Sequence, residues 1–203
     1  MNTKLLNTIQ SFDANPLSED RKTILDQLIA LLMRNPDAHK LVFVCTHNSR
    51  RSQMAQAWAH VANDFYGLDW QCFSGGTEIT AFNKNAIHAL QTLGFEIGKV
   101  EKRENPKYNI QFDSDKKPIE MFSKKYTDSP NPTKNFVAIM NCSDAETNCP
   151  FVTGASAILS LKYDDPKIFD DTQFEESKYE ETALKIGHEL FYVFKNIASI
   201  SKK

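Results

Sequence analysis

Short apolar runs that alternate with amphipathic stretches predict an α/β fold for this chain. Continuous apolar runs, rich in β-branched residues, are typical of strands buried on both faces of a parallel sheet, and they occur at residues 41–44 and 136–140. Shorter strands are expected at 70–73 and 157–161. Apolar residues recur at helical spacing in 51–63, 83–93 and 175–197. We therefore expect a four-stranded parallel twisted sheet flanked by helices.

An amphipathic segment precedes the first predicted strand. Leu5, Ile9 and Phe12 indicate a short helix, which Asn15-Pro16 ends. Residues 18–34 then predict a helix whose apolar stripe consists of Ile24, Leu25, Leu28, Ile29 and Leu32. We expect residues 1–38 to form a helical arm that covers the remaining domain, 39–203, or contributes to a homodimer. A partner-binding or regulatory arm is the alternative.

The clearest candidate for chemistry is the loop between the strand at 41–44 and the next helix. Cys45 ends the strand, and Arg51-Ser52 begins the helix. Such a loop presents backbone N–H groups and the positive end of a helix dipole to a tetrahedral oxyanion, and Arg51 adds a planar fork of donors. The same donors favour the thiolate of Cys45. A nucleophile at the floor of an anion-binding loop is predicted; a buried structural cysteine is the alternative.

The other cysteines fall into two classes. Cys142 follows the strand at 136–140, and Cys149 comes after a short polar loop. Because the carboxyl ends of parallel strands meet at one edge of a sheet, Cys142 should lie on the same side as Cys45. Two unrelated structural cysteines remain the alternative. Cys72 lies within a predicted strand and is expected to be a packed, inert thiol.

A long polar segment separates the second and third predicted strands of the sheet. Residues 99–134 carry several prolines and interspersed aromatic residues, which argue against disorder. We predict an ordered flap near the rim of the active site, with a short helix over 118–125 that starts at Pro118. A surface excursion with no role in catalysis is the alternative.

Composition limits the partners that the chain can have. A formal net charge of −2 gives no support to nucleic acid or an anionic membrane as a general partner. No apolar run approaches the roughly 18 residues that a membrane span needs, and no secretory signal is visible. The four cysteines are therefore expected to be reduced thiols in the cytoplasm, so that any disulfide is transient and catalytic. Neither a cofactor nor a metal is expected.

Three segments resemble a known superfamily. VCTHNSRRSQMAQ is similar to the phosphate-binding loop shared by low-molecular-weight protein tyrosine phosphatases and thioredoxin-coupled arsenate reductases. The stretch that begins FSGGTEITAFNKNA is similar to a supporting segment of the same superfamily. CSDAETNCP resembles a paired-cysteine segment of the reductases that the phosphatases do not normally carry. The resemblance covers roughly residues 40–197; the arm and an insertion at about 99–134 lie outside it.

The resemblance implies a reaction and a set of site residues. Cys45 would attack arsenate while Asp165, which precedes Pro166, acts as the general acid. Cys142 and Cys149 would complete a relay to a disulfide that a thioredoxin-like partner reduces. The oxyanion, arsenate or phosphate, would be held by Thr46, His47, Asn48, Ser49, Arg50, Arg51 and Ser52, with Ser74 and Asn83 as supporting residues. A simple helix N-cap is an equally good interpretation of Asn83.

The chain also departs from the superfamily pattern. His47 replaces a glycine at a position expected to need φ > 0, and Arg50 replaces a cysteine and should add positive charge to the rim. Lys167 stands where tyrosine phosphatases carry an aromatic residue. Gln56 replaces a carboxylate that some reductases use for a monovalent cation, so that site is not implied. A phosphatase or other phosphomonoesterase using Cys45, Arg51 and Asp165, or a non-catalytic anion-binding module, remain rival functions.

Overall fold

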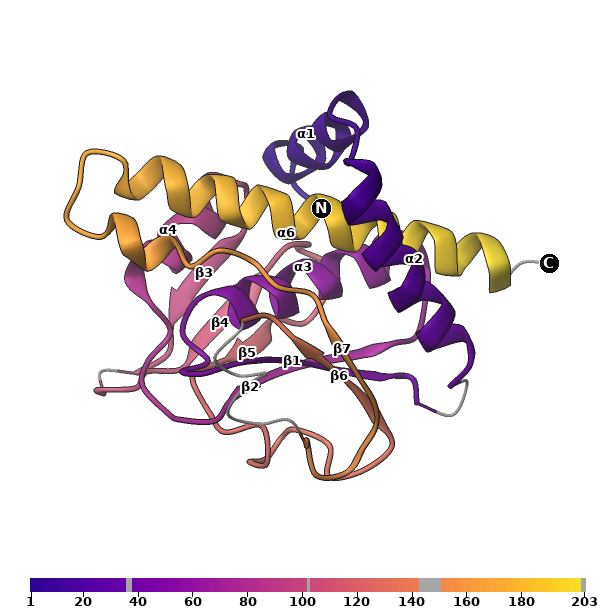
Figure 1. Cartoon of the computed structure of the whole chain (residues 1–203). Coiled ribbons are helices and arrows are strands. Elements are labelled where there is room, and N and C mark those ends of the chain that lie inside the picture. The colour runs from indigo at the N-terminus through magenta and orange to yellow at the C-terminus, as the bar shows by residue number, and fades with distance from the viewer. Residues whose placement is uncertain (36–37, 102, 143–150, 202–203) are drawn as a thin grey trace.

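A four-stranded parallel sheet forms the centre of the molecule, as the sequence predicts. The computed structural model describes residues 1–35, 38–101, 103–142 and 151–201. The strand order is β2-β1-β6-β7 (Figure 1). These strands are β1 (Lys40–Cys45), β2 (Gln71–Gly76), β6 (Phe136–Met140) and β7 (Ala155–Ser160). Each neighbouring pair is parallel, so the carboxyl ends of all four strands meet at one edge.

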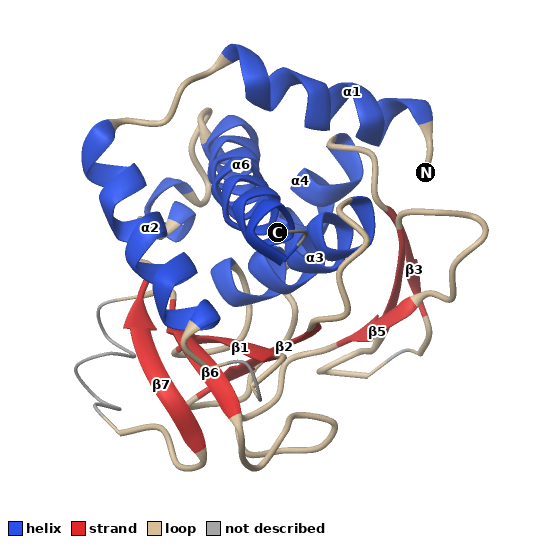
Figure 2. Cartoon of the chain, turned by 90° about the vertical axis from the view of Figure 1, so that its right-hand side faces the viewer, coloured by secondary structure: helices blue, strands red, loops and turns tan. Residues whose placement is uncertain are grey.

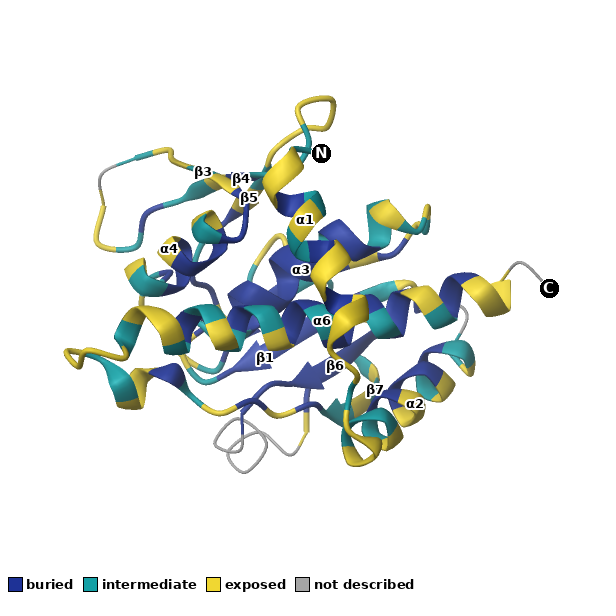
Figure 3. Cartoon of the chain, turned by 90° about the horizontal axis from the view of Figure 1, so that it is seen from above, coloured by how far each residue is buried: buried dark blue, intermediate teal, exposed yellow. Residues whose placement is uncertain are grey.

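Both faces of the sheet are buried, which explains the continuous apolar runs. Leu41 and Phe43 of β1 pack into the larger cluster on the helical side, and Val42 and Val44 pack into a smaller cluster on the other side. Successive side chains of a strand point to opposite faces, so one apolar run serves both clusters. Figure 3 shows β1 and β6 as buried along their length.

The labelled helices gather on one side of the sheet (Figure 2). They are α3 (Arg51–Phe65), α4 (Lys84–Thr92) and the long α6 (Glu175–Ser201), which packs along α3. A short 3-10 helix, η2 (Pro166–Phe169), lies between β7 and α6. None of the described helices is long and apolar enough to cross a membrane.

The N-terminal arm packs against the helices of its own chain. It consists of α1 (Thr3–Ser11), the 3-10 helix η1 (Phe12–Ala14) and α2 (Glu19–Met33). In Figure 2 both α-helices of the arm lie around α6. Leu25, Leu28 and Leu32 of α2 are buried in the same cluster as the α3 and α6 side chains. The arm therefore covers the domain and uses its apolar stripe within the chain.

Residues 96–121 form a second, antiparallel sheet of three strands. These are β3 (Glu96–Lys99), β4 (Tyr108–Gln111) and β5 (Ile119–Met121), in the order β3-β4-β5. The helix predicted over 118–125 is therefore wrong. Proline favours the first position of a helix locally, but Ile119 and Met121 pair with β4 instead.

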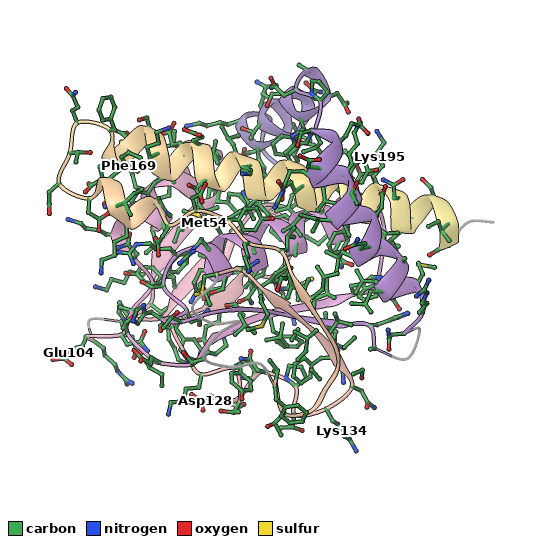
Figure 4. All side chains as sticks on the ribbon, viewed as in Figure 1. Met54, Glu104, Asp128, Lys134, Phe169 and Lys195 are labelled. Carbon is green, nitrogen blue, oxygen red and sulfur yellow. The ribbon has the colours of Figure 1, made fainter. Side chains whose placement is uncertain are left out.

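The segment that follows β5 runs across the second face of the main sheet. Tyr126 packs against the cluster of Val42 and Val44, and Figure 4 labels Asp128 and Lys134 further along this segment. β2 continues to Gly76, beyond the strand end expected at residue 73. A Cβ at Gly75 would lie 2.3 Å from the Tyr126 Cα, so glycine here permits close packing of two backbones.

Candidate active site

Cys45 lies at the junction of β1 and the loop that leads to α3. Its Sγ is 3.0 Å from the Oγ of Ser52, in the first turn of that helix. The Nδ2 of Asn48 donates to the same Oγ at 2.9 Å. Because the Ser52 oxygen already accepts this bond, its own hydrogen is available to the sulfur. The Ser52 hydroxyl is therefore placed to donate to Cys45 Sγ.

Asn48 connects the loop to three other parts of the chain. Its Nδ2 donates to Ser74 Oγ at 2.9 Å, and its Oδ1 accepts from Gln53 Nε2 at 3.2 Å and from the Lys124 backbone N at 3.0 Å. The side chain is fully buried. Asn48 also has φ 46°, so the expectation of φ > 0 at His47 was wrong by one position. Asparagine adopts the left-handed region more readily than other non-glycine residues, which makes this loop compatible with histidine at 47.

The two residues predicted to support the loop do so in different ways. Ser74 contacts Asn48 directly and donates onward to Gln56 Oε1 at 2.6 Å. The side chain of Asn83 instead caps α4, accepting from the N–H groups of its first turn. Only its backbone N reaches the loop, donating to Ser49 O at 2.9 Å. The N-cap interpretation of the Asn83 side chain is therefore the one that the structure shows.

The insertion contacts the loop through groups that sequence analysis did not single out. Ser123 Oγ donates to His47 O at 2.8 Å and accepts from the Thr80 backbone N at 3.0 Å. The adjacent Lys124 supplies the backbone N that reaches Asn48. Its own side chain is buried, and this burial lowers the pKa of the Lys124 amine to about 8. A backbone donor carries no residue-type signal, so these contacts could not be read from the sequence.

Two predicted loop residues use their side chains on neighbouring protein groups. Ser49 Oγ donates to Ala81 O at 2.6 Å, and His47 Nε2 lies 3.3 Å from Glu78 Oε2. An oxyanion in this loop would therefore meet chiefly backbone N–H groups and Arg51. This is the donor set that a strand-to-helix loop provides for phosphate-like anions.

Arg51 and Asp165 come together although 114 residues separate them. Arg51 Nη1 donates to Tyr163 O at 2.9 Å, and Nη2 donates to Asp165 Oδ2 at 2.6 Å. The other carboxylate oxygen accepts from the Lys167 backbone N at 3.0 Å. The structure thus joins the predicted acid to the predicted anion-binding arginine.

Arg50 contacts α6 and the segment before it. Its Nε donates to Tyr179 OH at 2.6 Å and its Nη2 to Asp170 Oδ2 at 3.3 Å, while Tyr179 OH donates to Asp170 Oδ1 at 2.7 Å. The sequence predicted a positive charge added to the rim. The structure corrects this, because Asp170 offsets that charge and the side chain is largely buried.

Cys142 lies at the same sheet edge as Cys45, as expected from parallel strands. Its Sγ is 3.6 Å from Thr46 Oγ1, the residue that follows Cys45. The second cysteine of the predicted pair, Cys149, lies outside the described residues. Cys72 is buried in β2, and burial raises the pKa of its thiol well above the usual range. Cys72 is therefore a packed thiol of low reactivity.

A groove of about 400 Å³ borders the loop from outside. Its lining includes Lys84 and Lys167 together with His47, Ser49, Arg50, Thr80 and Asn83. The two lysines are exposed, so they place positive charge where an anion would approach. Within the described ranges, no group of three or more His, Cys, Asp or Glu side chains could hold a metal ion.

The chain is similar to several known arsenate reductases. No protein-family model matches the chain. Arsenate reductase 2 of Staphylococcus haemolyticus is 31% identical over 130 residues, which is 64% of this chain and 80% of the relative. An arsenate reductase structure from Archaeoglobus fulgidus has a TM-score of 0.50 at 16% identity and covers 76% of this chain and 98% of that one.

A second solved structure shows the wider fold. The low-molecular-weight phosphotyrosine phosphatase of Vibrio cholerae has a TM-score of 0.52 at 17% identity, covering 80% of this chain and 95% of that one. At such identities the two structures show the fold alone, whereas the staphylococcal relative shows the family. The family predicted from the anion-binding loop is thereby confirmed. The chain belongs to the arsenate reductases of the low-molecular-weight protein tyrosine phosphatase superfamily.

Proposed function

We propose that this chain reduces arsenate to arsenite through a Cys45 nucleophile and a relay in which Cys142 and Cys149 supply two electrons and form a disulfide. The observation that carries the proposal is the 3.6 Å distance between Cys142 Sγ and Thr46 Oγ1. It brings a second thiol to the loop that holds the predicted nucleophile. Phosphate-ester hydrolysis needs one cysteine at this edge, whereas a redox relay needs a second.

The first step is attack of the Cys45 thiolate on arsenic. The backbone N–H groups of the loop and the guanidinium of Arg51 bind the oxyanion and stabilise its charge. Asp165 protonates the departing oxygen, which leaves as water, so a Cys45–arsenic bond replaces an arsenic–oxygen bond. The 2.6 Å contact between Asp165 and Arg51 supports this role, because it holds the acid beside the group that binds the anion.

The second step transfers two electrons to arsenic. The Cys142 thiolate attacks Cys45 Sγ, a sulfur–sulfur bond forms, and the electron pair of the breaking sulfur–arsenic bond stays on arsenic, which leaves as arsenite. Cys149 then attacks Cys142 and releases the Cys45 thiolate. The product is a Cys142–Cys149 disulfide, which a dithiol of the thioredoxin class reduces. A reducing compartment such as the cytoplasm suits this cycle.

The relay is tested by single-turnover chemistry. Cys149→Ser should release at most one arsenite per chain when supplied with thioredoxin, its reductase and NADPH, because the Cys45–Cys142 disulfide has no resolving thiol. Cys72→Ser is the matched control and should turn over repeatedly, since Cys72 lies in the packed interior of β2. Steady multiple turnover by Cys149→Ser would reject the relay.

Phosphatase activity is the alternative function that this fold allows, because arsenate and phosphate have the same geometry. Arsenite release and aryl phosphate hydrolysis should be measured in parallel for the wild type and Cys142→Ser. We expect Cys142→Ser to lose arsenate reduction and to keep whatever hydrolysis the wild type shows. Equal loss of both activities would indicate that Cys142 is structural, and absence of both in the wild type would favour an anion-binding module.

A homodimer formed through the N-terminal arm remains a separate prediction. The apolar stripe of α2 is buried within the chain, so a homodimer through residues 1–38 would use the exposed polar face of the arm. Sedimentation velocity over a range of concentrations measures this directly. A single monomeric species at all concentrations would exclude the dimer.

A further inference from the structure

We propose that the N-terminal arm belongs to the anion site, because Arg21 positions Arg51 through residues 162–163. The inference rests on the proposed function, in which Arg51 binds the oxyanion. Arg21 does not touch the anion loop itself. It is a positioning residue on an element that lies outside the resemblance to the superfamily.

The guanidinium of Arg21 is fixed by a carboxylate of α6. Arg21 lies in the first turn of α2, and its Nε donates to Glu189 Oε1 at 2.8 Å. Its Nη2 also contacts the second oxygen of Glu189, which completes a bidentate pair. The Glu189 side chain is only 1% exposed. A planar fork held on both oxygens of a buried carboxylate has little freedom to move.

The same guanidinium holds the segment that leads to the general acid. Its Nη1 donates to Lys162 O at 3.3 Å, and its central carbon lies 5.3 Å from the centroid of the Tyr163 ring. Arg21 thus contacts two consecutive residues between β7 and Asp165. On another side, Tyr163 and Asp165 border a cavity of about 230 Å³, so packing there restrains the segment less.

Tyr163 transmits this restraint to the anion site. Its carbonyl oxygen accepts from Arg51 Nη1 at 2.9 Å, and Asp165, two residues further on, binds Arg51 Nη2. Both of these hydrogen bonds of the Arg51 guanidinium therefore go to the segment that Arg21 holds. A displacement of about 1 Å at a catalytic group can cost on the order of 100-fold in rate, so small shifts of this segment matter.

The sequence contains a signal for this role. Arg21 shares one face of α2 with Leu25, Leu28 and Leu32, the buried positions of the helix. A charged residue on an apolar stripe needs a buried partner. Glu189, which lies among the buried residues of α6, is that partner.

The test separates anion binding from the later relay. Arg21→Met should raise the KM for arsenate and the inhibition constant of inorganic phosphate by the same factor, roughly three- to tenfold. Phosphate inhibition needs no thiol exchange by Cys142 or Cys149, so it reports on anion binding separately from the relay. Lys22→Gln is the matched control, since it removes one positive charge from the same helix and its amine pairs with the exposed Glu19. We expect it to change neither constant.

A second variant keeps the proposal testable if Arg21→Met is too unstable. Arg21→Met/Glu189→Met replaces both charges by apolar side chains and should recover the melting temperature. The contacts with Lys162 and Tyr163 are still lost, so the phosphate inhibition constant should stay raised. Recovery of that constant together with the melting temperature, or no change in Arg21→Met, would overturn the proposal.

Failure of the proposed function can be distinguished from failure of the role proposed for Arg21. If Cys45→Ser still reduces arsenate, the nucleophile has been misassigned whatever Arg21 does. If Cys45→Ser is inactive, Arg51→Met weakens phosphate inhibition and Arg21→Met does not, then only the role of the arm is wrong.

Discussion

The two halves of the anion loop are held by different kinds of contact. In the first half, residues 46–48, His47 O and Asn48 Oδ1 accept neutral hydrogen bonds from the insertion, namely from Ser123 Oγ and the Lys124 backbone N. Arg50 and Arg51 are held instead by ion pairs with Asp170 and Asp165. Thus an added segment supports each half: the insertion supports the first directly, and we infer that the arm supports the second.

This difference bears on how the site works. Neutral hydrogen bonds between buried groups change little with pH or salt, whereas ion pairs near the surface are weakened by screening and by protonation. The contacts of residues 46–48, next to Cys45, should therefore change little with pH or salt. The arginine half can exchange contacts with Asp165 for contacts with a bound oxyanion, because both compete for the same guanidinium donors.

The largest effect is expected from Asn48→Ala, which removes hydrogen bonds from residues 46–48, the half of the loop that neutral contacts hold. The substitution removes the Asn48 side chain as a partner of Ser52, Ser74 and the Lys124 backbone N, which all belong to buried residues, and it leaves a left-handed backbone without asparagine. We expect a loss of about 4 kcal/mol in the free energy of unfolding and at least about a 100-fold loss of arsenate reduction. Urea denaturation and initial rates measure the two effects.

Asn48→Gly separates the two causes. Glycine adopts φ near 46° without strain but makes none of the side-chain bonds, so it should recover about 1 kcal/mol of stability and little activity. Full activity in Asn48→Gly would mean that the backbone conformation alone shapes the loop.

Lys124, whose backbone N contacts Asn48, allows a test of pH dependence near residues 46–48. Burial lowers the pKa of its amine from 10.5 to about 8. Between these values the unfolded chain binds a proton that the folded chain does not, so the Lys124 contribution makes stability rise with pH in this window. Below pH 8 the folded chain carries a buried ammonium at a cost of about 3 kcal/mol.

Lys124→Met should remove this dependence. The variant should be about 3 kcal/mol more stable than the wild type at pH 7, and the difference should shrink toward zero as the pH approaches 10.5. Taking the difference between variant and wild type cancels groups common to both, such as Cys72. Activity should persist, since the loop contact is made by the backbone N of residue 124. A difference that does not vary with pH would contradict the assignment.

The sequence predicts the main sheet and the chemistry well because both depend on local signals. The runs at 41–44 and 136–140 are apolar on both faces, and the loop after Cys45 joins a strand to an amphipathic helix. What it does not predict depends on tertiary partners. The second strand was expected to end at residue 73, yet Gly75 and Gly76 continue β2, because the Tyr126 backbone packs on Gly75 and its N–H donates to Gly76 O.

The same reason limits the prediction of the site. Cys45 and Arg51 were predicted from residue type and spacing, and Asp165 from the resemblance, but Ser123 and the Lys124 backbone act through groups that most positions could supply. Positive φ was assigned to His47 by analogy with a glycine, whereas the chain places it at Asn48. Individual residues could be read from the sequence; the supports around them required coordinates.

A matched pair of glycines tests how the insertion packs on β2. At Gly75 an added Cβ would lie 2.3 Å from Tyr126 Cα, whereas at Gly98 nothing lies within 4 Å. Gly75→Ala should therefore destabilise the chain by about 2 kcal/mol, and Gly98→Ala should be neutral or slightly stabilising. Thermal unfolding compares the two. Equal melting temperatures would show that the insertion moves away from the sheet without cost.

The smallest loss of stability is expected from a substitution beside Arg50, in the half of the loop that ion pairs hold. Tyr179→Phe removes the hydroxyl that bridges Arg50 and Asp170 but leaves their direct contact at 3.3 Å. We expect a loss of about 1 kcal/mol in the free energy of unfolding and less than about a twofold change in the rate of arsenate reduction.

The loss should also vary with salt, since it depends on an ion pair near the surface, whereas the loss in Asn48→Ala should not. If Tyr179→Phe costs as much as Asn48→Ala at every salt concentration, the two halves are held equally firmly. The claim that Arg50 and Arg51 are held less firmly than residues 46–48 would then be rejected. Weak ion pairs could no longer explain how Arg51 exchanges Asp165 for a bound oxyanion.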